Sequence, residues 1–261
     1  MTTQAPGTTV TAPRRRPWLP LVIVIVLGVL VVLVALFFLA DTIVRGVAQQ
    51  RVQSEIEQHL PSNVRADVDV SIGGASVIAQ YLTGSFEEVR LSAPKTTVDG
   101  IPLNVEVTAK GVPVDQTKTI QDVRATIALD ATATQQVANA AGLSGTITLG
   151  TDAIGYADEL RVLGLTVPYD FEVQPTASAD RVTLTPTSVN VDTGAFGVVD
   201  LSGAATALLQ NDPPSICVAQ YLPKGTVLDE LVVTPSRATA KLSSASLRLD
   251  AASLQDLGTC S

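Results

Sequence analysis

Side chains that carry acid–base, nucleophilic or metal chemistry are scarce in this chain. Among 261 residues there are one histidine, His59, and two cysteines, Cys217 and Cys260. A serine or cysteine nucleophile needs a base, usually histidine, and a zinc ion needs several His, Cys or carboxylate ligands. His59 lies among polar residues directly before Leu60-Pro61, where we expect a solvated helix end. We therefore expect no catalytic residue, no metal site and no cofactor.

Paired carboxylates are the other arrangement that could support catalysis. Adjacent residues on a strand point to opposite faces, so the two members of such a pair do not converge on one substrate atom. The chain also lacks G-x-S-x-G, H-E-x-x-H, G-x-x-x-x-G-K-[ST] and G-x-G-x-x-G motifs. A hydrolase or transferase would need distant carboxylates brought together by folding, which the sequence leaves open. The adjacent pairs are Glu87/Glu88, Asp158/Glu159 and Asp229/Glu230.

An uncharged apolar run dominates the N-terminal part of the chain. Leu19–Ala40 has no charged residue, and its 22 residues make a helix of roughly 33 Å, enough for a hydrocarbon core of about 30 Å. Arg14–Arg16 precede it and Trp18 lies at its edge, as interfacial anchors do. A cleaved signal peptide is the alternative, but its apolar region is shorter and ends in small residues. We expect an uncleaved single-pass anchor over residues 19–40.

Charge is distributed unevenly about this run. All 25 acidic residues and 14 of the 17 basic residues lie at or beyond Asp41, which gives that part a formal net charge of −11. The positive-inside rule then predicts a cytoplasmic N-terminus, with residues 1–18 as a disordered tail and residues 41–261 outside the plasma membrane. An acidic chain without a long basic run also argues against nucleic acid as a partner.

Both cysteines fall in the part predicted to be exported. An even number of cysteines in an oxidising compartment favours one disulfide, Cys217–Cys260. Such a bond would tie down the C-terminus, since Cys260 is the penultimate residue and chain ends fray unless they are held. Two free buried thiols are the alternative.

Beyond the anchor, apolar residues recur first at helical and then at strand spacing. Residues 41–61 predict an amphipathic juxtamembrane helix whose apolar stripe packs on the following domain. From Val64 the period changes to two, and Asp99-Gly100 marks a hairpin turn. The many alternating segments and few helical ones in residues 62–261 predict an α+β domain of twisted antiparallel sheet wrapped around a few helices. The expected strands are 64–72, 86–93, 96–98, 101–109, 120–129, 146–149, 159–163, 165–173, 181–185, 188–191, 227–234, 238–242 and 245–249, and the expected short helices are 75–82, 131–141 and 203–210.

Glycines, prolines and apolar spacers form three recognisable segments. They are Val70-x-Ile72-Gly73-Gly74-x-Ser76-Val77-Ile78-x-Gln80-Tyr81-Leu82-x-Gly84-x-Phe86-x-x-Val89, then Val98-Asp99-Gly100-Ile101-Pro102-Leu103 with Gly111-Val112-Pro113-Val114, and Tyr221-Leu222-Pro223-Lys224-Gly225-x-x-Leu228-x-x-Leu231-x-Val233-Thr234-Pro235. The chain thereby resembles the actinobacterial LmeA-like phospholipid-binding family over essentially all of residues 41–261. It departs at Ala75-Ser76, where many members have Pro-Phe.

The resemblance implies a protein of the cell envelope that binds phospholipid and supports maturation of phosphatidylinositol mannosides and lipomannan. It also implies a fold related to tubular lipid-binding modules. We expect a non-enzymatic module that binds or transfers phospholipid at the outer face of the plasma membrane. A structural or adaptor ectodomain that docks on a cell-wall enzyme is the other hypothesis, and it predicts a filled core without lipid.

The short helix expected at 75–82 is where we predict contact with lipid. Its apolar side chains could form a mobile lip, and the strand that follows would continue the same surface. Ordinary core packing is the alternative for each of these residues. The predicted lipid-binding residues are Val77, Ile78, Tyr81, Leu82, Phe86 and Val89.

Overall fold

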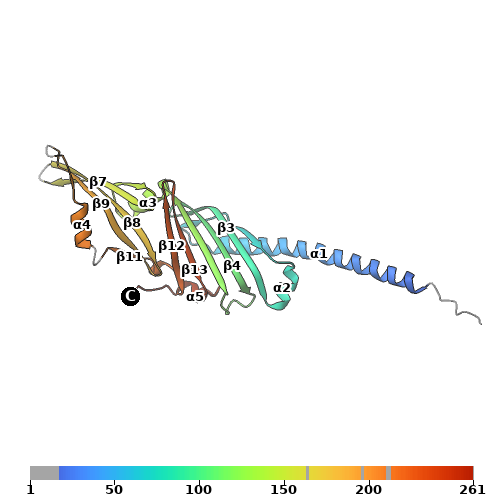
Figure 1. Ribbon diagram of the computed structural model, residues 1–261. Coiled ribbons are helices and arrows are strands. Elements are labelled where there is room, and N and C mark those ends of the chain that lie inside the picture. Colours follow the sequence, from blue (N-terminus) through green and yellow to red (C-terminus); the bar gives the residue numbers. More distant parts are fainter. Residues whose placement is uncertain (1–17, 163–164, 195–196, 210–212, 261) are drawn as a thin grey trace, which may run out of the picture. The chain divides into compact units, whose positions relative to one another are not determined.

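The structure is a computed structural model that describes residues 18–162, 165–194, 197–209 and 213–260 (Figure 1). The chain divides into two units, the first ending at Ile43 and the second starting at Val44. Helix α1 (Trp18–His59) forms the first unit and continues into the second. The predicted tail, residues 1–18, lies outside the described residues except for Trp18.

The first unit has the character of a membrane span. The side chains of α1 from Val24 to Leu39 are exposed, which a helix surrounded by lipid tolerates and a helix in water does not. Within the described residues, α1 is the one helix long and apolar enough to cross a membrane. The chain therefore has an N-terminal apolar helix with the length and composition of a membrane anchor, followed by a separate domain.

In the second unit, the larger sheet, sheet 1, is antiparallel throughout. Its strands follow the order β1-β3-β4-β5-β13-β12, and β2 pairs with β3 beside β1. Within the described residues the sheet does not close on itself. The strands are β1 (Val64–Arg65), β2 (Asp69–Ile72), β3 (Ser85–Val98), β4 (Ile101–Pro113), β5 (Asp122–Asp130), β12 (Thr226–Thr234) and β13 (Arg237–Ser244).

The hairpin of β3 and β4 carries the predicted turn. Asp99 and Gly100 both have positive φ values, 52° and 82°, which Asp tolerates and Gly adopts freely. Val98 and Ile101 pair directly across the turn, so the register matches the alternation predicted from the sequence. The two strands expected at 86–93 and 96–98 form one strand, because the backbone passes the intervening Pro94 as an irregularity between Ala93 and Thr96.

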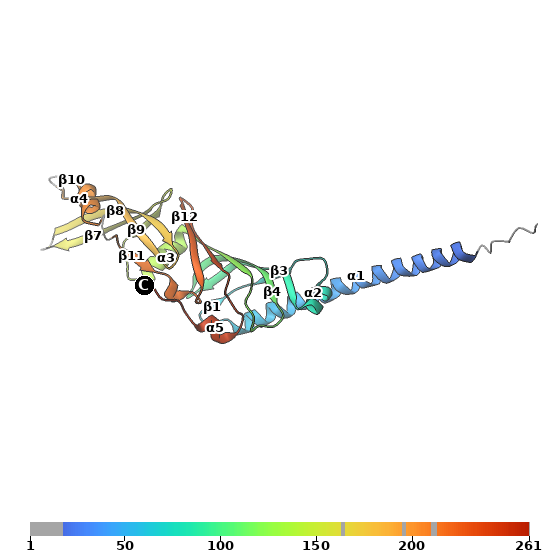
Figure 2. The ribbon, with the colours of Figure 1, turned by 60° about the horizontal axis from the view of Figure 1, so that its bottom comes forward.

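Sheet 2 is also antiparallel and is built largely from one continuous stretch of chain. Its order is β10-β9-β8-β7-β6, with β11 on β9. Strand β10 and helix α4 lie at the same end of this sheet (Figure 2). The strands are β6 (Thr146–Leu149), β7 (Ile154–Val162), β8 (Leu165–Ser178), β9 (Arg181–Asp192), β10 (Val198–Asp200) and β11 (Ser215–Cys217).

Short helices connect and border the sheets. Three of them begin at side-chain caps, since Ser76, Asp130 and Asp250 each accept a hydrogen bond from a backbone N–H of the first turn. Helix α5 was not expected from the sequence, although Asp250 three residues before Ser253 is its capping signal. The helices are α2 (Val77–Thr83), α3 (Ala131–Ala140), α4 (Ser202–Leu209), α5 (Ala251–Gln255) and the 3₁₀ turn η2 (Ala219–Tyr221).

The α+β class, with antiparallel sheets and few helices after an apolar helix, is confirmed. The alternation predicted for the first strand segment is confirmed as well, because Val68 and Val70 are each 5% exposed while Asp67 and Asp69 face solvent. The apolar stripe of residues 41–61 behaves differently from the expectation. Ile56 packs against Val68 and Val70, whereas Val47 is 60% exposed.

Candidate functional site

Two rows of aliphatic side chains cross sheet 1 on one face. Residues that pair directly in an antiparallel sheet point to the same face, so the strand register defines each row. Five strands at about 4.8 Å spacing give each row a width of roughly 19 Å. We call these ten residues the apolar face of sheet 1. The first row is Ala93, Val105, Ile127, Ala240 and Leu231, and the second is Leu91, Val107, Ala125, Leu242 and Leu228.

Neighbouring elements bury the apolar face most completely at its two edges. At the β3 edge, β2 and Ile56 of α1 pack against Ala93. At the β12 edge, Val182 of sheet 2 packs with Leu228 and Leu242, which are 4% and 6% exposed. Besides these two residues and Ala93, the face has seven residues, which pack against the buried clusters of the domain but are only partly buried themselves. A filled core would bury them, so this face retains apolar surface that an apolar ligand could cover.

Helix α2 is fixed at one end of sheet 1 by a buried glutamine. Gln80, 5% exposed, donates from Nε2 to the carbonyl oxygen of Gly73 at 2.9 Å, and its Oε1 accepts from the backbone N–H of Glu87 at 2.7 Å. Gly84 then ends the helix in the left-handed conformation, at φ 83°. These contacts hold α2 from both sides, and sequence reasoning had treated Gln80 only as part of a motif.

The six residues predicted to bind lipid lie in different surroundings. Val77 is 3% exposed and belongs to the core, and Ile78 is partly buried. Phe86 and Val89 pack together against the buried cluster of Ala109, Val112, Ile120 and Val123. The side chains of Tyr81 and Leu82 are instead 62% and 79% exposed on α2. Their contact with lipid stays a prediction.

Arg45 of α1 is a residue that sequence reasoning missed. Its Nη1 donates to the carbonyl oxygen of Ile72 at 2.6 Å, and its Nη2 donates to that of Gly74 at 2.9 Å. Both carbonyls belong to the segment that leads from β2 into α2. The guanidinium thus ties this segment to α1 within a few residues of the apolar run.

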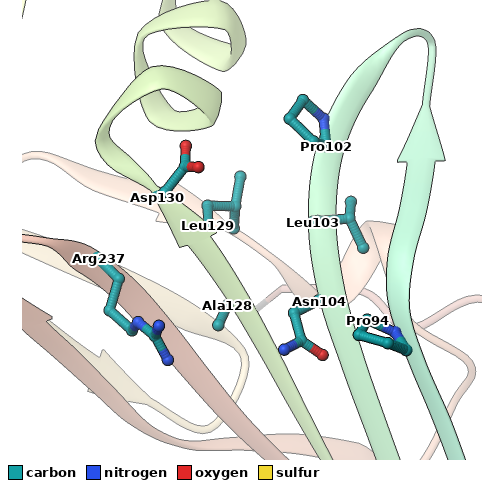
Figure 3. Close-up of a pocket in the computed structure, with 8 residues that line it drawn as sticks. All are labelled: Pro94, Pro102, Leu103, Asn104, Ala128, Leu129, Asp130 and Arg237. Atoms are coloured by element: carbon teal, nitrogen blue, oxygen red, sulfur yellow. The ribbon is translucent and has the colours of Figure 1, made fainter.

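A small cavity opens where β4 and β5 separate beyond the pair Asn104–Ala128 (Figure 3). Its volume is about 170 Å³, and Leu103 and Leu129 form part of its wall. The Oδ1 atom of Asn104 is buried without a hydrogen-bond partner among the described residues. Figure 3 shows the side chains of Asn104 and Arg237 extending on either side of Ala128. An unpaired buried acceptor is costly, so this cavity suits a ligand that donates a hydrogen bond.

The acidic residues of sheet 2 form a second cavity of about 480 Å³, lined by Asp158, Glu159, Asp170 and Asp192 among others. Asp158 is engaged within the protein, since Oη of Tyr156 donates to its Oδ2 at 2.7 Å and Oγ of Ser144 donates at 3.0 Å. These bonds lower the pKa of Asp158, and the same carboxylate raises the pKa of Tyr156. Because these hydrogen bonds occupy the carboxylate, its role is structural. We call the hydrogen-bonded pair of Tyr156 and Asp158 the clamp.

The two cysteines form the predicted disulfide, which closes a loop across 43 positions of sequence. The last residues also bind through their backbone, as Gly258 donates to the carbonyl oxygen of Leu222 at 3.0 Å. Within the described residues, no group of three or more His, Cys, Asp or Glu side chains is placed to hold a metal ion.

Comparison with known proteins agrees with this geometry. The family model described as LmeA-like phospholipid-binding matches residues 39–243, which include sheet 1 in all but its last residue. The chain matches no curated protein and no solved structure.

Proposed function

We propose that this chain, which belongs to the LmeA-like phospholipid-binding family, holds the acyl part of a phospholipid against the apolar face of sheet 1 and presents or transfers it at the outer face of the plasma membrane. The observation that carries the proposal is the partial exposure of residues such as Val105, Val107 and Ile127 in the middle of that face. Removing an acyl chain from water contributes about 0.8 kcal/mol per CH₂ group.

The cavity beside Asn104 supplies a place for the polar part of the same lipid. Asn104 and Arg237 point to the face opposite Val105 and Ile127, so a headgroup would reach them through the gap where β4 and β5 separate. Leu103 and Leu129 line that gap, and Arg237 contributes a positive charge beside the carboxylate of Asp130. Arg237 pairs in register with Asp130, which lines the same cavity, and its guanidinium could bind a phosphate there. Asn104 Oδ1 would accept a hydrogen bond from a headgroup hydroxyl.

The anchor would hold the domain beside its source of lipid. Three arginines before the apolar run and a formal net charge of −11 after it support a cytoplasmic N-terminus and an exported domain of residues 62–261 behind the juxtamembrane segment 41–61. A tether of this kind raises the local concentration of membrane lipid at the binding face. No reaction is required of the protein in this role, which would supply phospholipid for maturation of phosphatidylinositol mannosides and lipomannan.

Lipid transfer from nanodiscs tests the function. The full chain is placed in donor nanodiscs with fluorescent phosphatidylinositol, and the appearance of the label in acceptor vesicles is followed. We expect faster transfer than from nanodiscs that carry only residues 1–43, and a slower rate with Ile127→Asn. Equal rates from all three preparations would rule out transfer and presentation.

A structural or adaptor role is the second candidate, and one observation favours it. Large aliphatic side chains are exposed at the end of sheet 2 that carries β10 and α4, and Leu208 and Leu165 are 81% and 70% exposed. Such a patch is typical of a protein contact. Crosslinking in cells through Leu208→Cys should then capture one stable protein partner, whereas a lipid-transfer role does not require it.

A further inference from the structure

Helix α2 carries an exposed apolar pair. Tyr81 and Leu82 are 62% and 79% exposed, although Val77 and Gln80 of the same helix are buried. The helix, with sequence VIAQYLT, contains no charged residue. Exposed Leu and Tyr side by side on an uncharged helix are unfavourable in water, and they match the composition of a membrane interface.

The position of α2 along the chain indicates which surface covers this pair. Arg45 binds the carbonyl oxygens of Ile72 and Gly74, and Ser76, two residues further on, caps α2. Arg45 follows the last apolar residue of the span, Ala40, by only five positions, and five residues reach at most about 17 Å even when fully extended. The headgroup layer adds about 5–7 Å to each side of the hydrocarbon core. Arg45 therefore keeps the start of α2 within reach of the headgroup layer.

We infer that α2 is a second membrane contact, in which Tyr81 and Leu82 insert into the leaflet that the chain enters at Ala40. Tyr places its ring among the acyl carbons and its hydroxyl among the headgroups, as interfacial tyrosines do. Leu82 adds aliphatic surface beside it. The inference does not depend on lipid binding by sheet 1, because it concerns intact bilayer as the occupant of α2.

Tryptophan fluorescence in nanodiscs tests the contact with the full chain. Trp18 is the single tryptophan, so Trp18→Phe gives a silent background into which Leu82→Trp is introduced. The matched control is Leu208→Trp on α4, since Leu208 and Leu82 are 81% and 79% exposed. The nanodiscs contain phosphatidylcholine brominated near the headgroup end of its acyl chains, which quenches tryptophan on contact.

We expect the emission of Leu82→Trp to fall roughly twofold or more relative to unbrominated nanodiscs, and that of Leu208→Trp to stay unchanged. Tyr81→Trp serves as a second reporter on the same helix. If both reporters are quenched no more than Leu208→Trp, the inference is overturned. Adding Ile127→Asn to Leu82→Trp should leave the quenching intact; its loss would assign the signal to lipid on sheet 1 and would equally overturn the inference.

Discussion

Val105 and Ile127 lie directly opposite each other on β4 and β5, in the middle of sheet 1, and both side chains remain partly exposed. Each packs against a buried cluster at one edge of the sheet, but their neighbours in the same row, Ala93 and Ala240, are small and neither side chain of the pair is fully buried. A sheet that used this face only as core would bury these two residues first. Their exposure is the feature that a bound acyl chain explains.

Replacing Ile127 by Asn should therefore reduce phospholipid binding. A polar side chain on the apolar face faces the acyl chain without a partner, which costs about 1–3 kcal/mol and lowers affinity roughly tenfold. Thr126→Asn is the control, because Thr126 lies on the same strand with its side chain on the opposite face. Crosslinking yield with a photoactivatable phospholipid in nanodiscs reports the binding. Equal losses for the two variants would exclude a role of this face.

Asn104→Ala should leave the free energy of unfolding unchanged or raise it by about 1 kcal/mol, since Asn104 Oδ1 is buried without a partner in the described chain. The matched control is Asn190→Ala. Asn190 Nδ2 donates to Asp170 at 2.9 Å and to Ser188 at 3.1 Å, so its removal should destabilise the protein. Urea unfolding of both variants measures the difference. A loss for Asn104→Ala as large as for Asn190→Ala would mean that Asn104 has a structural partner and no free acceptor.

Much of the local structure could be predicted because it depends on neighbours in sequence. Alternation along Ile101–Ala109 predicted β4, the Asp99-Gly100 turn set its pairing with β3, and the even cysteine count indicated the disulfide. Long-range pairing left no such signal. Nothing local specifies that β5 pairs with β13, more than 100 positions later, yet that pairing aligns Ile127 with Ala240 and completes the apolar rows.

The candidate site was predictable only in part for the same reason. Phe86 and Val89 were singled out as apolar residues near a short helix, but burial in a shared cluster depends on Ile120, which a different segment supplies. Arg45 gave no signal at all, because its partners are backbone carbonyls and no side-chain pattern marks them. The exposure of Tyr81 follows from the orientation that Gln80 gives α2, which requires the folded positions of Gly73 and Glu87.

The clamp between Tyr156 and Asp158 predicts an anomalous tyrosine titration. The raised pKa of Tyr156 should set one of the four tyrosines apart in an alkaline absorbance titration, and Asp158→Asn should return it toward 10.0. The hydrogen bond between Tyr156 and Asp158 stabilises the folded protein while the tyrosine is protonated. This contribution of Tyr156 is present below pH 10.0 and is lost as pH rises through the raised pKa of the folded state. The contribution of the ionised Asp158 carboxylate to stability is present above pH 3.8 and is lost as pH falls through its lowered pKa in the folded state.

Asp170→Asn is the control for this titration, since Asp170 binds Asn190 and no hydrogen bond joins it to Tyr156 within the described residues. Four tyrosines that titrate together in the unsubstituted protein would contradict the clamp.

Removal of the disulfide by the double change Cys217→Ser and Cys260→Ser should lower the free energy of unfolding by about 4 kcal/mol, because the bond closes a loop spanning 43 positions. The backbone contacts of the C-terminus, such as Gly258 to Leu222, should exchange their amide hydrogens faster in the variant. Urea unfolding and hydrogen exchange measure the two effects. Reducing agent should reproduce the loss in the unsubstituted protein and have no further effect on the double variant.

The most direct measurement is a map of where phospholipid contacts the protein. The full chain in nanodiscs is irradiated with phosphatidylinositol that carries a photoactivatable group at the end of one acyl chain, and the crosslinked positions are identified by mass spectrometry. Besides the anchor, we predict crosslinks at Val105, Val107, Ile127 and Ala240 of sheet 1, reduced by Ile127→Asn. Crosslinks restricted to residues 19–40 and to α2, with none on β4, β5 or β13, would contradict lipid binding by sheet 1.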